Sequence, residues 1–166
     1  HNEKYKELLM QLEKRKGSVL IFTKTKHGTR RMAKNLSNDG YKADALHGNL
    51  NQNKRDKVMN NFRMKKFKVL VATDIASRGL DVPHIEHVVN YDLPQVVEDY
   101  VHRLGRTARA RAKGSAICFV SPEEKGLWDE INYFLNPSTV KKPINQKHIK
   151  NIVSKKRNSS KSNNLS

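Results

Sequence analysis

Residues 68–81 read KVLVATDIASRGLD, and this stretch decides the fold class. The run from Lys68 to Ala72 is mainly valine and leucine, as a β-strand that is buried on both faces requires. Thr73 and Asp74 follow directly and are polar. In an open sheet of parallel strands, ligands bind beyond the carboxyl ends of the strands. The stretch therefore predicts a buried strand that ends at a binding edge.

Short apolar runs alternate with longer helical patterns elsewhere in the chain, and further strands are predicted at residues 18–22, 43–46, 87–91 and 115–120. This alternation is typical of a parallel sheet with helices on both faces. The first predicted helix ends at Gly17 and the second at Gly40, while Asn51 caps the third and Pro122 opens the last. We expect an α/β domain whose sheet is mainly parallel and has five or more strands.

The chain has 166 residues and a formal net charge of +17, from 33 lysine and arginine against 16 aspartate and glutamate residues. One domain is expected, at residues 1–138. This charge favours polyanionic partners, nucleic acid first and anionic membrane second. Eight basic residues and no acidic ones lie from Lys141 onward, so residues 139–166 are expected to be a basic, disordered tail. The tail either strengthens nucleic-acid binding or only keeps the chain soluble.

Several classes of protein are excluded by composition. The single cysteine, Cys118, excludes an internal disulfide and lies in an apolar run, as a buried small residue would. No apolar stretch approaches the roughly 18 residues that span a bilayer, and no signal-peptide pattern occurs near the start. The histidines show no metal-ligand spacing, so no metal site is expected. We expect a cytoplasmic protein without membrane attachment, monomeric as an isolated domain.

Polar residues follow the predicted strands at their carboxyl ends. Thr25 lies in the polar run after residue 22, His47 and Gly48 follow residue 46, and Thr73 follows residue 72. Each of these alone is explained by turn chemistry. Together they place hydroxyl groups, backbone N–H groups and cations at one edge of the sheet, which favours binding of phosphate oxygens.

A basic cluster lies at residues 100–109, which read YVHRLGRTAR. Three arginines, Arg103, Arg106 and Arg109, occur at a three-residue spacing. Guanidinium groups stay charged and offer a planar fork of donors that matches phosphate oxygens. The stretch alone leaves two interpretations open, a clamp for a polyphosphate and a solvated basic helix face.

The order and spacing of these segments resemble the DEAD-box RNA helicases from Leu8 to Phe134. The matching segments are motif IV at residues 19–26, the Gln-x-x-Arg element at Gln52 and Arg55, motifs V and Va at residues 69–83, and motif VI at residues 102–109. The resemblance implies a RecA-like, three-layer α/β/α fold and the second of two RecA-like domains in an ATP-dependent RNA helicase.

The elements of a first RecA-like domain do not occur in this sequence. It has no Gly-x-x-x-x-Gly-Lys-Ser/Thr phosphate loop, and Asp74 has no adjacent acid that would help to hold a metal. The resemblance therefore implies that ATP with Mg²⁺ is held mainly by an N-terminal RecA-like domain of the same protein. That domain and RNA are the expected partners, and the chain by itself is expected to be inactive.

The resemblance also implies roles for single residues at the nucleotide. Arg106 and Arg109 match the arginine fingers that reach the γ-phosphate across the interdomain cleft. Gly79 and Asp81 match the nucleotide-binding segment, in which the carboxylate accepts a hydrogen bond from the ATP ribose. Both arginines are expected to point out of this domain and to be exposed in the isolated chain. Ala108 departs from the glycine of many family members, which makes Arg109 the weaker match.

Six residues match positions that contact or support the RNA backbone: Thr25, Gly48, Arg55, Thr73, Asp74 and Arg78. Because backbone contacts carry no sequence information, RNA binding is expected to be sequence-independent. His102 and Arg103 are expected to join an interdomain network. For Arg78 and Arg103, a structural ion pair stays open as the alternative.

Two other functions stay open beside the helicase. One is half of a DNA translocase of the same superfamily, which residues 72–81 disfavour. The other is an adaptor that binds RNA or protein without catalysis. The set of Arg106, Arg109 and Asp81 disfavours the adaptor, because an adaptor has no need of nucleotide-binding groups.

Overall fold

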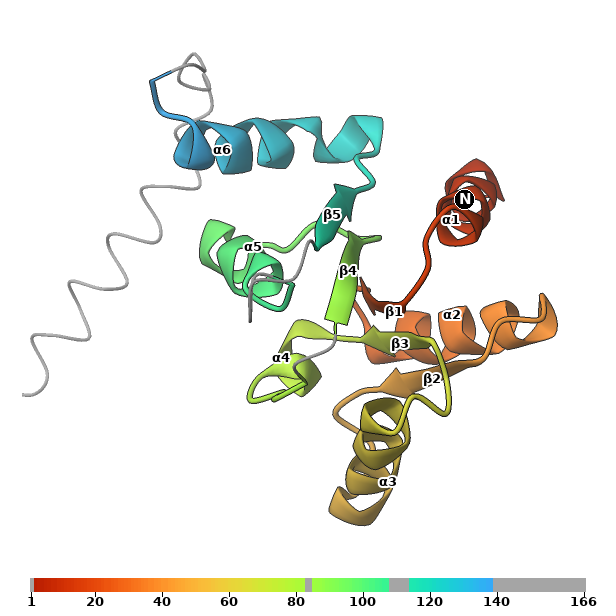
Figure 1. Ribbon diagram of the computed structural model, residues 1–166. Coiled ribbons are helices and arrows are strands. Elements are labelled where there is room, and N and C mark those ends of the chain that lie inside the picture. Colours follow the sequence, from red (N-terminus) through yellow and green to blue (C-terminus); the bar gives the residue numbers. More distant parts are fainter. Residues whose placement is uncertain (1, 83–84, 108–113, 139–166) are drawn as a thin grey trace, which may run out of the picture. The chain divides into compact units, whose positions relative to one another are not determined.

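The computed structural model describes residues 2–82, 85–107 and 114–138 (Figure 1). Arg109, Ala108 and residues 139–166 lie outside the described residues. The chain divides into two compact units, His1–Pro122 and Glu123–Ser166. The first unit holds the whole sheet.

A parallel sheet of five strands forms the centre of the first unit (Figure 1). The strands are β1 (Ser18–Phe22), β2 (Ala43–Leu46), β3 (Val69–Ala72), β4 (Ile85–Asn90) and β5 (Ser115–Cys118). Their order in the sheet is β2-β3-β1-β4-β5, and every neighbouring pair is parallel. The predicted parallel sheet is therefore confirmed, with β1 and β2 at the predicted bounds.

Five α-helices connect or precede these strands: α1 (Asn2–Glu13), α2 (Lys26–Asn38), α3 (Gln52–Arg63), α4 (Asp74–Ser77) and α5 (Val97–Leu104). The Asn51 side chain accepts a hydrogen bond from the Lys54 backbone N–H at 3.0 Å, which confirms the predicted cap of α3. The last predicted helix begins as a 3-10 turn, η2 (Pro122–Glu124), before α6 (Lys125–Leu135). The short helix α4 was not predicted.

The two faces of the sheet are covered by different helices. On β1, Val19 and Ile21 pack with side chains of α1 and α2, while Leu20 and Phe22 pack with side chains of α3 and α4. Strand β3 alternates in the same way, with Val69 among the first group. All of these strand side chains are fully buried, and burying each one stabilises the fold by about 1.5–3 kcal/mol. The continuous apolar runs of the sequence thus correspond to strands buried on both faces.

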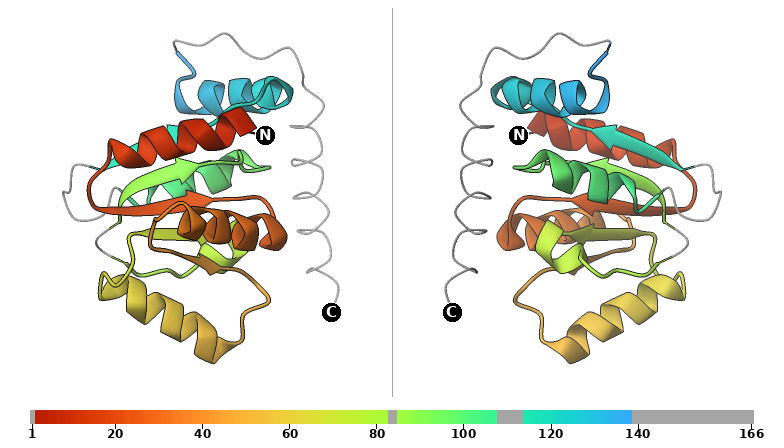
Figure 2. Two further views of the ribbon diagram at one scale, coloured as in Figure 1. Left: turned by 90° about the vertical axis from the view of Figure 1, so that its right-hand side faces the viewer. Right: turned by 90° about the vertical axis from the view of Figure 1, so that its left-hand side faces the viewer.

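Figure 2 shows the strands from the side, so that their amino ends and carboxyl ends lie at opposite edges of the sheet. We call these the amino edge and the carboxyl edge. Strand β4 begins at Ile85, earlier than predicted, and β5 ends at Cys118, before the end of its apolar run. Among the described residues, no helix has the length and apolar character needed to cross a membrane.

Candidate nucleotide and RNA interface

The carboxyl edge begins at β1 and β3 with two threonines that cap helices. Thr25 is the N-cap of α2, and its hydroxyl accepts a hydrogen bond from the Gly28 N–H at 3.0 Å. Thr73 is the N-cap of α4, and its hydroxyl accepts from the Ala76 N–H at 3.4 Å. In both places the helix begins within a few residues of the end of the strand. The threonine cap makes this possible, because its hydroxyl accepts a hydrogen bond from an N–H group that has no partner within the first turn of the helix. Both predicted RNA-binding threonines therefore lie at the same edge.

The predicted His47–Gly48 pair lies after β2 at this edge. His47 is buried, and its Nδ1 accepts a hydrogen bond from the Asn49 N–H at 3.3 Å. Burial lowers the pKa of His47 below its usual 6.5, and the nearby Arg30 and Lys26 cations lower it further. Gly48 is exposed, and open space surrounds the position that a β-carbon would take. A ligand can therefore approach the backbone at Gly48 closely.

The centre of the carboxyl edge is filled by the guanidinium group of Arg103, from α5. Its Nε and Nη2 donate to the two carboxylate oxygens of Asp74 at 2.6 and 2.7 Å. Its Nη1 donates to Asn90 Oδ1 at 2.8 Å and to the Asp92 carbonyl at 2.6 Å. The guanidinium carbon also lies 4.6 Å from the centre of the Phe22 ring. Arg103 thus ties α4, α5, β1 and the end of β4 together.

This arrangement bears on the two interpretations of Arg103. The side chain is 2% exposed, and its three guanidinium nitrogens all bond within this domain. A guanidinium group in such a place is stable only when it is paired, since an unpaired buried charge costs several kcal/mol. The geometry favours the structural ion pair over the interdomain role. It also engages both carboxylate oxygens of Asp74, so the proposed RNA contact of Asp74 gains no support.

The crevice between β1 and β4 is where the direction of the chain connections reverses, which is the usual ligand site in open α/β sheets. Here protein groups fill part of the crevice, and a cavity of about 580 Å³ opens beside them, with Lys24, Thr25 and Asp92 in its lining. The Lys24 N–H donates to the Asp92 carboxylate at 2.8 Å, and the buried hydroxyls of Thr23 and Thr29 lie 2.7 Å apart. These bonds, together with those of Arg103, hold in place the side chains that border the cavity.

Two further arginines of the predicted RNA-binding set lie beside α4. Arg55 of α3 donates from Nη2 to the Ala76 carbonyl at 3.1 Å and so connects α3 to α4. Arg78, after α4, lies 3.7 Å from the carboxylate of Asp99, and His102 Nδ1 lies 3.9 Å from the same group. The side chains of Arg78 and His102 are 68% and 72% exposed. Arg55 is therefore placed to support the α4 segment, while Arg78 and His102 face solvent.

The predicted nucleotide-binding segment runs from Gly79 to Asp81 and meets the end of α5. Gly79 has a φ of +75°, a left-handed conformation that favours glycine. Arg106, just beyond α5, donates from Nη1 to the Leu80 carbonyl at 2.8 Å. Arg63 of α3 donates to the Asp81 carbonyl at 3.4 Å. The fold thus brings Arg106 and the segment with Asp81 together, although they are far apart in the sequence.

The expected exposure of Arg106 is corrected by this geometry. Arg106 is half-buried and folds back onto the Leu80 carbonyl, because that carbonyl offers the acceptor that the guanidinium group would otherwise find in water. Arg109, the other predicted finger, lies outside the described residues. Asp81 is exposed at the edge of the same segment.

Two functional partners were not predicted from the sequence. Asn90 is fully buried at the end of β4, and Asp92 follows it; both bond to Arg103. A buried polar side chain normally has a hydrogen-bond partner, so an asparagine at the end of an apolar strand was the available signal. No signal in the sequence showed that Arg103 is the partner of Asn90, because the two residues lie 13 positions apart on different elements.

Comparison with known proteins identifies the family. Residues 1–111 match the family described as "Helicase conserved C-terminal domain". The chain is 46% identical over 120 residues to "ATP-dependent RNA helicase DBP2" of Chaetomium globosum, which is 72% of this chain and 21% of that protein. It is also 46% identical over 122 residues to "ATP-dependent rRNA helicase rrp3" of Aspergillus terreus, 73% of this chain and 27% of that protein. The chain thus spans about a quarter of the length of these curated relatives.

Solved structures agree with this assignment over most of the chain. The C-terminal domain of the DEAD-box protein Dbp5 has 30% identity and a TM-score of 0.76, covering 93% of this chain and 92% of that one. A DEAD box protein from Methanococcus jannaschii has 41% identity and a TM-score of 0.73, covering 84% of this chain and 38% of that one. The chain therefore belongs to the helicase conserved C-terminal domain family and has the fold of the C-terminal RecA-like domains of DEAD-box RNA helicases.

Proposed function

We propose that this chain is the C-terminal half of an ATP-dependent RNA helicase and that its carboxyl edge works on a nucleotide held mainly by an N-terminal RecA-like domain. The observation that carries the proposal is the contact between Arg106 and the Leu80 carbonyl, at 2.8 Å. It puts a guanidinium group beside a carboxylate-bearing segment at the edge where ligands bind in this class of sheet.

The donors and acceptors at this edge fit the two ends of ATP. The exposed Asp81 carboxylate suits the neutral ribose diol, which donates hydrogen bonds, and it repels the triphosphate. Arg106 suits the phosphate end, since its planar fork matches phosphate oxygens. Phosphoryl transfer builds up negative charge on the departing phosphate, and an arginine supplied by another domain stabilises that charge. Mg²⁺, when bound, neutralises phosphate charge, and we assign its ligands to the N-terminal domain.

RNA binding is proposed at the other end of the same edge. Thr25 and Thr73 lie at the starts of α2 and α4, and Gly48 leaves open space for a sugar-phosphate backbone. Arg55 holds the α4 segment in place through the Ala76 carbonyl. These groups address the backbone and not the bases, so the proposed binding is independent of RNA sequence.

The proposed mechanism is closure of the cleft between the two RecA-like domains. ATP and RNA each gain contacts when both domains are together, so each ligand shifts the pair from open to closed. An RNA strand bent along the closed cleft no longer pairs in a duplex. Hydrolysis removes the phosphate that Arg106 contacts and returns the pair to the open state.

Joining the chain to an N-terminal RecA-like domain tests the proposal. The N-terminal domain of the Chaetomium globosum relative would be fused upstream of His1, and ATP hydrolysis would be measured with and without single-stranded RNA. We expect hydrolysis that RNA stimulates, and none from either half alone. Equal stimulation by single-stranded DNA would favour the DNA translocase. RNA binding without any hydrolysis in the fusion would favour the adaptor.

A further inference from the structure

The amino edge of the sheet carries a second basic region, which the carboxyl-edge mechanism does not use. Strands β2, β3 and β1 are neighbours, and basic residues precede each of them. These residues are Lys14, Arg15 and Lys16 before β1, Lys42 before β2, and Lys65, Lys66 and Lys68 before β3. Because the strands are parallel, the three segments lie at the same edge, shown side-on in Figure 2. Positive charge is thereby gathered from three separate parts of the sequence.

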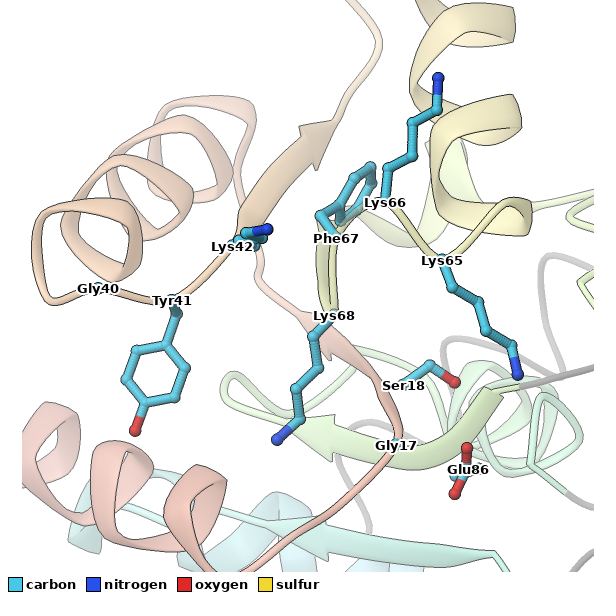
Figure 3. A pocket seen from close by; sticks show the side chains of 10 residues that line it. All are labelled: Gly17, Ser18, Gly40, Tyr41, Lys42, Lys65, Lys66, Phe67, Lys68 and Glu86. Atoms are coloured by element: carbon cyan, nitrogen blue, oxygen red, sulfur yellow. The ribbon is translucent and has the colours of Figure 1, made fainter.

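A cavity of about 450 Å³ opens between these segments (Figure 3). Its lining includes Tyr41, Lys42, Lys65, Phe67, Lys68 and Glu86. In Figure 3 the Lys68 side chain extends into the space between Tyr41 and Gly17, while the Lys65 side chain extends toward Ser18 and Glu86. Four lysines and a single acid line the cavity, so it favours an anionic ligand.

The cations of this cavity are available to a ligand. Lys42, Lys65 and Lys66 are exposed, and within the part of the chain that the structure describes their ammonium groups have no ion pair or hydrogen bond. The Lys68 ammonium donates to the Arg15 carbonyl at 2.5 Å, which leaves two of its three donors.

A purely structural explanation would be that these lysines stabilise the negative ends of the helices. That effect acts within the last turn of a helix. Neither α1 nor α2 has a basic residue in its last turn, and Lys42 lies beyond the end of α2 at Asn38. Helix electrostatics therefore does not account for Lys42, whereas Arg15, just after α1, donates to the Gln11 carbonyl in the last turn of that helix at 2.8 Å.

The backbone at Lys65 has the left-handed conformation that ends α3. Lys65 has a φ of +55°, and among the described residues it is the only one other than glycine with a positive φ. It follows α3 at the place where helices usually end with glycine, and a residue with a β-carbon costs about 1–2 kcal/mol there. The Lys65 N–H donates to the Phe62 carbonyl and the Lys66 N–H to the Asn61 carbonyl, both at 2.9 Å, so this conformation ends α3 and sets Lys65 in the wall of the cavity.

We propose that this amino-edge site binds the phosphates of single-stranded RNA that extends beyond the carboxyl edge. Aromatic rings beside cations form the usual platform for an unpaired base and its phosphate, and Tyr41 and Phe67 are half-buried rings in the cavity wall. The five residues of β1 separate the two edges by about 15 Å through the sheet, and because helices cover both faces, an RNA strand that joins the edges over the surface must be longer than this. The inference rests on the proposed RNA binding at the carboxyl edge and names a second contact surface for the same strand.

The test compares oligouridines of two lengths on the 166-residue chain, one covering only the carboxyl edge and one longer by at least about 15 Å. The variant carries Lys42→Glu and Lys65→Glu. The matched control carries Lys6→Glu and Lys125→Glu, two exposed lysines within α1 and α6 that change the net charge equally and do not line the amino-edge cavity. Thermal unfolding verifies that both variants fold, and fluorescence anisotropy at several salt concentrations gives the affinities.

We expect the long RNA to bind more tightly than the short one and the Lys42/Lys65 variant to lose this advantage. Its salt slope for long RNA should fall by about 1.4, since each phosphate contact on a single strand contributes about 0.7. The short RNA should bind all three proteins alike, and its binding separately tests the proposed function. Equal losses in the variant and the control would overturn the site. Unchanged affinity for long RNA with lost binding of a polyglutamate peptide would assign the site to an acidic protein instead.

Discussion

The two edges of the sheet present their positive charge in different ways. At the carboxyl edge, Arg103 and Arg106 donate hydrogen bonds within the domain, and Arg103 is 2% exposed. At the amino edge, Lys42 and Lys65 are exposed and form no hydrogen bond or ion pair with the described residues. The comparison shows that a buried guanidinium group can hold several elements of a site together through its hydrogen bonds. An exposed ammonium group on a flexible stem instead attracts a mobile polyanion by its charge.

The largest expected effect is at the carboxyl edge. Arg106→Ala in the fused two-domain enzyme should reduce RNA-stimulated ATP turnover roughly a thousandfold or more, because the charge on the departing phosphate loses its stabilising guanidinium group. Affinity for ATP without RNA should be largely unchanged. The measurement is steady-state ATP hydrolysis at saturating RNA.

Arg63→Ala is the control for this variant, since Arg63 also donates to the Gly79–Asp81 segment, at the Asp81 carbonyl. It should keep most of the turnover. Normal stimulated turnover in Arg106→Ala would show that the fingers are elsewhere.

The next effect concerns stability and separates paired from exposed arginines at the same edge. Asp74→Ala should lower the free energy of unfolding by about 3–5 kcal/mol, because it leaves the buried Arg103 without its carboxylate. Asp99→Ala, which removes the carboxylate beside the exposed side chains of Arg78 and His102, should cost less than about 1 kcal/mol. Urea unfolding of the chain measures both. Equal losses in the two variants would contradict the structural role of Arg103.

A smaller effect of opposite sign is expected at the amino edge. Lys65→Gly should raise the free energy of unfolding by about 1 kcal/mol, since glycine adopts a φ of +55° without strain. Lys65→Ala keeps the β-carbon and should give no such gain. We expect binding of long RNA to fall in both variants and stability to rise only in the glycine variant. This result would show that the Lys65 charge acts in RNA binding, whereas its backbone conformation affects only stability. A glycine variant less stable than the alanine variant would refute the strain.

The smallest effect is the pH dependence contributed by His47. Its pKa lies below 6.5 in the folded chain, so the unfolded chain binds a proton that the folded chain does not. The stability that neutral His47 contributes is present above pH 6.5 and is lost as the pH falls below it. His47→Gln should reduce this loss of stability on acidification, measured by urea unfolding on both sides of pH 6.5. An identical pH profile in the variant would show that His47 does not contribute.

Elements with strong local signals were predicted correctly from the sequence. Strands β1 and β2 have the predicted bounds, since each is a short apolar run between polar or turn-forming residues. The Asn51 cap of α3 was equally visible. Helix α4 was missed because four residues are too few to show a helical period. Strand β4 was predicted to begin two residues late because the charged Glu86 separates Ile85 from the rest of the apolar run.

For the candidate site, the sequence predicted which residues lie at the carboxyl edge, but it did not predict which of them form hydrogen bonds with one another. Arg103 and Asp74 were both singled out but were expected to have separate roles, because spacing alone does not show which residues a fold brings together. Arg106 was expected to be exposed, and the acceptor at Leu80 became visible only in three dimensions. The amino-edge lysines had no motif to mark them, since they meet only through the parallel order of β2, β3 and β1.

Amide hydrogen exchange with and without long single-stranded RNA distinguishes the two edges in a single experiment. We predict slower exchange at residues 47–49 and 73–78, at the carboxyl edge, and at residues 41–42 and 65–68, at the amino edge. Short RNA should protect only the first pair of segments. Unchanged exchange at residues 47–49 and 73–78 in a chain that binds RNA would refute RNA binding at the carboxyl edge.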